Sequence, residues 1–87
     1  MPKFLIERNF ADELEVTKDA ADSVQRINAE EGVKWLFSFL SADKKKTYCL
    51  YEAPSIEAIR LAAKRNNLPA DVIVEIGTEI DPAVMFA

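Results

Sequence analysis

The 87-residue chain contains no histidine, a single cysteine and only two glycines. Without histidine, the Ser-His-Asp and Cys-His arrangements of nucleophilic catalysis are excluded, and so is the commonest transition-metal ligand. Gly32 and Gly77 lie too far apart to form a glycine-rich phosphate loop. One cysteine cannot form an internal disulfide. The sequence therefore contains no complete motif for catalysis or metal binding.

Charge and hydropathy narrow the range of partners. The net charge is −4, and the short Lys44–Lys46 run is a poor substitute for the clustered cations that neutralise phosphates. No stretch approaches the ~20 apolar residues of a membrane span, and the N-terminus lacks the layout of a signal peptide. We therefore expect a cytoplasmic protein that binds neither nucleic acid nor membrane. The length predicts a single domain over residues 1–87.

Residues 33–54 are the most informative stretch of the chain. Two apolar runs flank a charged turn at residues 42–45, a pattern that predicts a β-hairpin. Successive strand side chains point to opposite faces, so one surface should carry Trp35, Phe37, Phe39, Tyr48 and Leu50. The opposite surface should carry Leu36, Ser38, Cys49 and Tyr51. The same register pairs Phe39 with Tyr48, Phe37 with Leu50 and Trp35 with Glu52. Two helices can cover only one of these apolar faces, so the other needs a partner.

The remaining segments complete an α+β pattern. Strands are expected at residues 3–10 and 71–78. In the first, Glu7 and Arg8 should either point to opposite faces or mark the place where the strand frays. Helices should begin after the caps Thr17 and Ser55 and end near Gly32 and Asn66-Asn67. The resulting β-α-β-β-α-β order predicts a ferredoxin-like sandwich, with a four-stranded antiparallel sheet and both helices on one face.

Three features have both a functional and a structural interpretation. Cys49 is either a soft metal ligand or thiolate nucleophile, or a small buried hydrophobic residue. The second interpretation is favoured, because a reactive thiol needs a nearby cation and the sequence places none beside Cys49. Glu7 and Glu52 are strand carboxylates beside aromatic residues, suited to acid–base work or to ion pairs with Arg8 or Lys46. The lysine run either binds an anion or keeps the hairpin turn soluble, and we favour the second.

A series of short motifs follows one after another along the chain: Glu7-Arg8, Asn28-Ala29-Glu30, Gly32-Val33, Trp35, Ser38, Lys46-Thr47, Cys49, Tyr51, Ala53-Pro54-Ser55, Glu57-Ala58-Ile59-Arg60, Ala63 and Leu68-Pro69. On these motifs the chain, to about Glu75, resembles a family of small bacterial proteins, a domain of unknown function named for a nickel-binding member. The resemblance implies a ferredoxin-like fold, dimerisation through the open sheet face and, in at least one branch, nickel binding.

The chain departs from the family pattern at the position that matters most for a metal. The usual Trp-x-His-Ser-Tyr is here Trp35-Leu36-Phe37-Ser38-Phe39, so Phe37 replaces the expected ligand histidine. Nickel favours imidazole and thiolate donors. We therefore predict weak or no stoichiometric nickel binding, and we assign no metal ligand.

Three functions are compatible with these observations. The first is a homodimeric binding protein that holds a small ligand between its sheets, near Glu7, Asn28, Trp35, Phe37, Tyr48 and Glu52. The second is a cofactor-free enzyme of the dimeric α+β barrel type that uses Glu7 or Glu52 as acid or base, an argument from fold analogy. The third is a structural dimer with a dry, filled interface. The sequence identifies no substrate and no catalytic residue.

Overall fold

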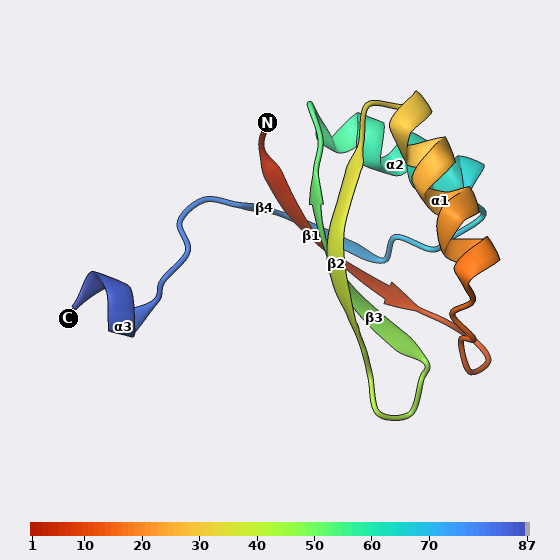
Figure 1. Cartoon of the computed structure of the whole chain (residues 1–87), viewed down its shortest axis with the longest axis horizontal. Helices are drawn as coiled ribbons and strands as arrows, with labels where there is room; N and C mark the ends of the chain where they lie inside the picture. Colours follow the sequence, from red (N-terminus) through yellow and green to blue (C-terminus); the bar gives the residue numbers. More distant parts are fainter. Residues whose placement is uncertain (87) are drawn as a thin grey trace.

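The structure is a computed structural model that describes residues 1–86. Its elements are β1 (Lys3–Asn9), α1 (Lys18–Glu30), β2 (Lys34–Leu40), β3 (Lys46–Glu52), α2 (Ile56–Arg65), β4 (Val72–Ile76) and α3 (Pro82–Met85). The strands form one antiparallel sheet in the order β2-β3-β1-β4. Figure 1 shows α1 and α2 on the same side of this sheet. The predicted ferredoxin-like β-α-β-β-α-β fold is confirmed.

The helix boundaries follow the predicted capping residues. The Thr17 hydroxyl accepts a hydrogen bond from the Ala20 amide at 3.1 Å, and the Ser55 hydroxyl accepts one from the Ala58 amide at 3.2 Å. Gly32, with φ of 71°, follows α1, and Asn67, with φ of 55°, follows α2. Both residue types adopt this left-handed conformation more readily than others, which explains why the helices end there.

The face of the sheet beneath α1 and α2, here called the covered face, carries most of the core. Paired residues form three rows across it: Trp35–Tyr51–Phe4, Ser38–Cys49–Ile6–Ile73, and Leu40–Thr47–Arg8. Cys49 is buried in this core, together with Phe4, Ile6, Val33, Tyr51, Ala53, Ile59 and Ala62. Glu7 and Arg8 do point to opposite faces, with Arg8 buried on the covered side.

One part of the predicted hairpin register is wrong. Phe39 lies opposite Tyr48 and Phe37 opposite Leu50, as expected, but Trp35 pairs with Tyr51 rather than with Glu52. The cause is a β-bulge between Trp35 and Phe37, because an extra residue in one strand reverses the alternation of faces. Trp35 therefore lies on the covered face, whereas Phe37 lies on the opposite one.

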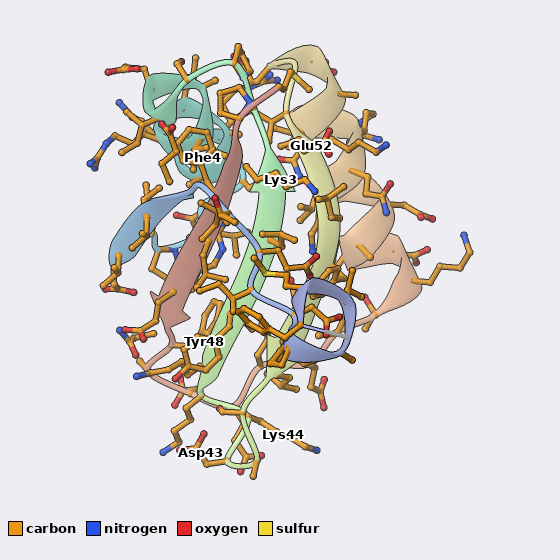
Figure 2. The ribbon with its side chains drawn as sticks, turned by 90° about the vertical axis from the view of Figure 1, so that its left-hand side faces the viewer. Lys3, Phe4, Asp43, Lys44, Tyr48 and Glu52 are labelled. Carbon is orange, nitrogen blue, oxygen red and sulfur yellow. The ribbon has the colours of Figure 1, made fainter. Side chains whose placement is uncertain are left out.

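That opposite side, here called the open face, carries apolar side chains that no helix of the sandwich covers. One row, Phe37–Leu50–Leu5–Val74, is apolar from edge to edge, and the next runs Phe39–Tyr48–Glu7–Val72. Phe37 is 51% exposed and Phe39 66% exposed. Figure 2 looks onto this face, with Tyr48 near its lower end. Lys34, Glu52 and Lys3 form a charged row at one end of the same face. Both faces of the sheet thus carry apolar side chains, as the strand pattern predicted.

The segment after β4 is unlike the rest of the chain. The described residues from Gly77 to Phe86 are all exposed, and four large apolar side chains lie among them: Ile80, Val84, Met85 and Phe86. Figures 1 and 2 show this tail, with its short helix α3, running out on the side of the open face. Within residues 1–86 the tail therefore stays exposed.

Candidate functional site

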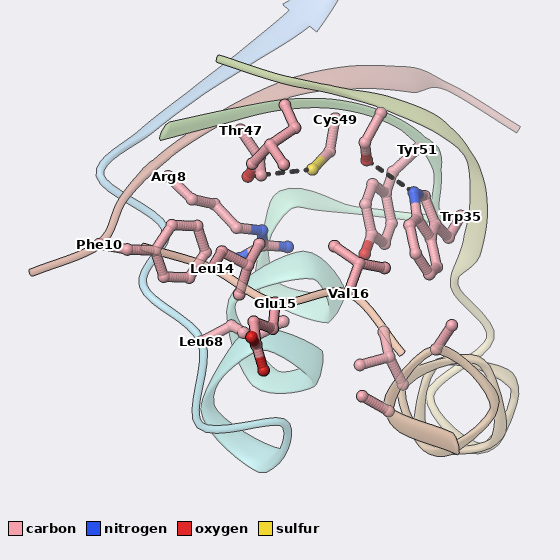
Figure 3. Close-up of a pocket in the computed structure, with 15 residues that line it drawn as sticks. Arg8, Phe10, Leu14, Glu15, Val16, Trp35, Thr47, Cys49, Tyr51 and Leu68 are labelled. Atoms are coloured by element: carbon pink, nitrogen blue, oxygen red, sulfur yellow. Dashed lines mark hydrogen bonds between the residues drawn. The ribbon is translucent and has the colours of Figure 1, made fainter. Parts of the chain in front are cut away.

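A cavity of about 260 Å³ lies between the covered face of the sheet, α1 and the loop that precedes α1. Its lining is mostly apolar, and Figure 3 shows it opened, with side chains converging from β1, β2, β3 and the loop. The lining residues are Arg8, Phe10, Leu14, Glu15, Val16, Ala20, Ala21, Val24, Trp35, Ser38, Leu40, Thr47, Cys49, Tyr51 and Leu68.

The cavity follows from the composition of α1. The N-terminal half of this helix offers only Ala20, Ala21 and Val24 toward the sheet, and such short side chains do not fill the space beneath a helix. At the C-terminal end of α1, Arg65 of α2 bonds the carboxylates of Glu30 at 2.6 Å and Glu31 at 2.8 Å.

Arg8 is the charged residue most deeply buried in this site. It is only 3% exposed, and its Nη1 donates a hydrogen bond to the Pro69 carbonyl at 2.5 Å. Its guanidinium carbon lies 5.7 Å from the centre of the Tyr51 ring, within the range of a cation–π contact. Among residues 1–86, no carboxylate lies within ion-pair distance of it. Figure 3 shows the guanidinium pointing into the cavity.

Tyr51 and Asn28 form the polar connection behind the cavity. Asn28 is buried, and its side-chain amide donates to the Tyr51 hydroxyl at 3.5 Å while its carbonyl accepts from the Asn66 amide at 3.1 Å. Burial raises the pKa of Tyr51 above its ordinary value, although the nearby charge of Arg8 opposes part of the shift. The phenol is therefore neutral at physiological pH.

Two further contacts complete the polar lining. The Trp35 indole Nε1 donates to the Ser38 hydroxyl at 2.8 Å, and its ring stacks on Tyr51 with centroids 6.5 Å apart. The Cys49 thiol contacts the Thr47 hydroxyl at 3.6 Å. Because both Cys49 and Thr47 are buried, the thiol fits the structural interpretation of a small core residue with a weak S–H donor.

The structure divides the six predicted ligand-binding residues between the two faces. Trp35 lies on the covered face and Asn28 on α1, which packs against that face, and only Trp35 lines the cavity. The others lie on the open face, where Glu7 is 3.7 Å from the Lys46 ammonium and pairs with Tyr48 across the strands. That group consists of Glu7, Phe37, Tyr48 and Glu52. The six residues therefore do not form one site within a single chain.

Sequence reasoning did not select Arg8 as a site residue, although it assigned Arg8 to the face opposite Glu7. The overlooked signal was a charge near the end of β1 whose alternation places it on the same face as the buried Phe4 and Ile6. Leu14, Val16 and Leu68 were missed because they lie outside the predicted sheet and helices. No periodic pattern links such loop residues to a cavity.

Two of three comparisons with known proteins point to the same family. The family described as "Nickel responsive protein SCO4226-like" matches residues 4–76, that is, from β1 to the end of β4. The crystal structure of SCO4226 from Streptomyces coelicolor A3(2) superposes with a TM-score of 0.75 at 23% identity, covering 90% of this chain and 99% of that one. That similarity shows the fold alone. No curated protein matches this chain.

The residues of this chain do not fit a nickel ion. The sequence has no imidazole to offer, and its one thiol is buried beside Thr47. Within the described part of the chain, no three cysteine, aspartate or glutamate side chains gather where an ion could sit. Nickel is held best by imidazole and thiolate donors in a clustered set, and neither face of the sheet supplies one.

Proposed function

The chain belongs to the SCO4226-like family of nickel-responsive proteins, and we propose that it is a homodimeric binding protein for a small, largely apolar molecule. In this proposal the open faces of two copies pack together, and the cavity beneath α1 of each copy holds the ligand. The observation that carries the proposal is that the sheet has apolar side chains on both of its faces. One face has its own helices and a cavity, and the other has no cover from residues 1–86.

The open face has the composition of an interface core. Its central row holds four apolar side chains, and the neighbouring row adds Phe39 and Tyr48. Phe37 and Phe39 contact each other edge to face, with ring centres 5.6 Å apart. Aromatic residues are enriched in buried interface centres, and large exposed apolar patches mark interaction sites. A second copy offers the same complementary surface through a two-fold axis.

The size of the face suggests that the tail takes part in the dimer. Four strands about 4.8 Å apart, the longest about 23 Å long, make a flat patch of at most roughly 440 Å². A standard interface buries about 800 Å² on each partner. The exposed Ile80, Val84, Met85 and Phe86 extend on the same side, and we propose that they supply the missing area by packing against the partner.

Other functions have less support. Weak or absent nickel binding remains part of the proposal, because the donor set is missing. An acid–base role for Glu7 or Glu52 rests on fold analogy alone, since Glu7 faces the Lys46 cation rather than a substrate pocket of its own. A pocket between the paired sheets remains a prediction, and so does a cytoplasmic location. Within residues 1–86 no helix has the length and apolar character needed to cross a membrane.

Sedimentation equilibrium tests the dimer with a matched pair of variants. Phe37→Glu places a charge in the central row of the open face, whereas Leu61→Glu places one on α2 at a side chain of similar exposure. We expect the wild type and the Leu61→Glu variant to sediment as dimers and the Phe37→Glu variant as a monomer. A wild type that stays monomeric at 100 µM, or a Phe37→Glu variant as dimeric as its control, would contradict the proposal.

A further inference from the structure

The buried charge of Arg8 has no negative partner in the described chain. A cation removed from water is strongly destabilised unless an anion, hydrogen bonds or an aromatic face compensates. Here the Pro69 carbonyl and the Tyr51 ring offer partial compensation, and both are neutral. Within residues 1–86 the charge has no counter-ion, and it lies at the wall of a cavity, where a ligand could reach it.

The loop beside the cavity does carry a carboxylate, but it does not compensate Arg8. Glu15 lines the cavity and is exposed, and its oxygens lie outside ion-pair distance of the guanidinium. Figure 3 shows the Glu15 carboxylate directed away from the Arg8 head group. Arg8 is therefore free to receive an anion from outside the chain.

The shape of the cavity limits what that anion can be. A water molecule occupies about 30 Å³ in the liquid, so 260 Å³ holds about nine groups of that size. Most of the lining is aliphatic or aromatic, which favours an apolar body. A guanidinium fork fits a planar carboxylate better than other small anions of one charge.

We infer that the cavity beneath α1 binds a small carboxylic acid of about eight to ten non-hydrogen atoms, with its carboxylate against Arg8 and its apolar body against Trp35, Val24 and Leu14. This inference rests on the proposed function and adds to it the chemical class of the ligand. Four residues line both the cavity and a more open depression beside it, and we place the entrance there: Leu14, Glu15, Val16 and Leu40.

Trp35 provides the measurement, because it lines the cavity and is the only tryptophan. Octanoate and 1-octanol are matched probes that differ in charge at one end. We expect both to change the Trp35 fluorescence, one molecule per chain, with octanoate binding about ten- to a hundredfold more tightly, the range of one charge-assisted hydrogen bond or more. Arg8→Met should remove this preference and leave octanol binding in place.

A second pair of variants keeps the test valid if Arg8→Met fails to fold. Ala21→Leu fills the cavity from α1 without touching Arg8, and Ala29→Leu makes the same change at an exposed position of α1 outside the cavity. Ala21→Leu should weaken binding of both probes at least about tenfold, as expected when a side chain occupies the pocket. Ala29→Leu should leave both affinities unchanged.

The outcomes separate the two proposals. Equal affinity for octanoate and octanol, or a preference for octanoate that survives Arg8→Met, would overturn the assignment of a carboxylate to Arg8 while leaving an apolar ligand site in place. Binding of neither probe, or binding that Ala21→Leu does not affect, would overturn the ligand site of the proposed function as well. The sedimentation experiment on the dimer does not depend on any of these ligand-binding outcomes.

Discussion

The indole Nε1 of Trp35 donates a 2.8 Å hydrogen bond to the hydroxyl of Ser38, and the bond spans the bulge in β2. It ties the residue before the irregularity to a residue after it, on the covered face. The bulge determines that Trp35 lines the cavity while Phe37 lies on the open face. The two proposed surfaces of the protein therefore depend on one local feature of one strand.

Ser38→Ala removes the acceptor of this bond, and we expect the free energy of unfolding to fall by about 1 kcal/mol. Urea denaturation measures the change. In a double-mutant cycle, the substitution should have a smaller effect in a Trp35→Phe background, where the donor is already absent. Strictly additive effects would show that the Trp35–Ser38 bond contributes nothing to the free energy of unfolding.

Alkaline pH should destabilise the fold through Tyr51. Burial raises the pKa of Tyr51 above 10.0, so the unfolded chain releases this proton at a lower pH than the folded chain does. The stabilisation is complete below pH 10 and is lost as pH rises through the folded pKa. Thermal unfolding between pH 9 and 11 should show a smaller loss for Tyr51→Phe than for Tyr48→Phe, the control on the open face. Equal losses would contradict the burial argument.

The hairpin turn contains a residue in a left-handed conformation. Lys44 has φ of 64°, a region that glycine adopts without steric cost. We expect Lys44→Gly to leave stability unchanged or raise it by up to about 1 kcal/mol, and Lys45→Gly to lower it, since only a position with positive φ benefits from glycine. Chemical denaturation distinguishes them, and a loss at Lys44 equal to that at Lys45 would refute the explanation.

The affinity for nickel should depend on residue 37, where Phe37 replaces the histidine of the family pattern. We expect no stoichiometric nickel on the wild type by equilibrium dialysis with elemental analysis. Phe37→His introduces an imidazole where the resemblance places one, and the apparent affinity should rise about tenfold. Phe39→His is the control at the next open-face position of β2. Stoichiometric nickel on the wild type would show that the chain holds the ion with other donors.

Much of the fold could be predicted from local chemistry. Thr17 and Ser55 begin helices, Gly32 and Asn67 follow their ends, and the hairpin pairs Phe37 with Leu50 as its alternation requires. These features depend on neighbouring residues alone. The capping side chains act within one turn, and the strand period acts between adjacent residues.

The site was harder to predict because it depends on packing between distant segments. The bulge at Leu36 has no signal in the apolar pattern, since Trp35, Leu36 and Phe37 fit either face. The short helix α3 was not expected, because its four residues lack a helical period. The cavity arises because the short side chains of α1 do not fill the space between the helix and the sheet. Such a gap can be recognised only once the position of the helix on the sheet is known.

Native mass spectrometry of the purified protein, in the negative-ion and positive-ion modes, tests the central claim most directly. The account predicts a species of twice the 9.8 kDa chain mass, with one small organic acid released from each chain on activation or bound after addition of octanoate. A monomer that carries no added mass under either condition would contradict it.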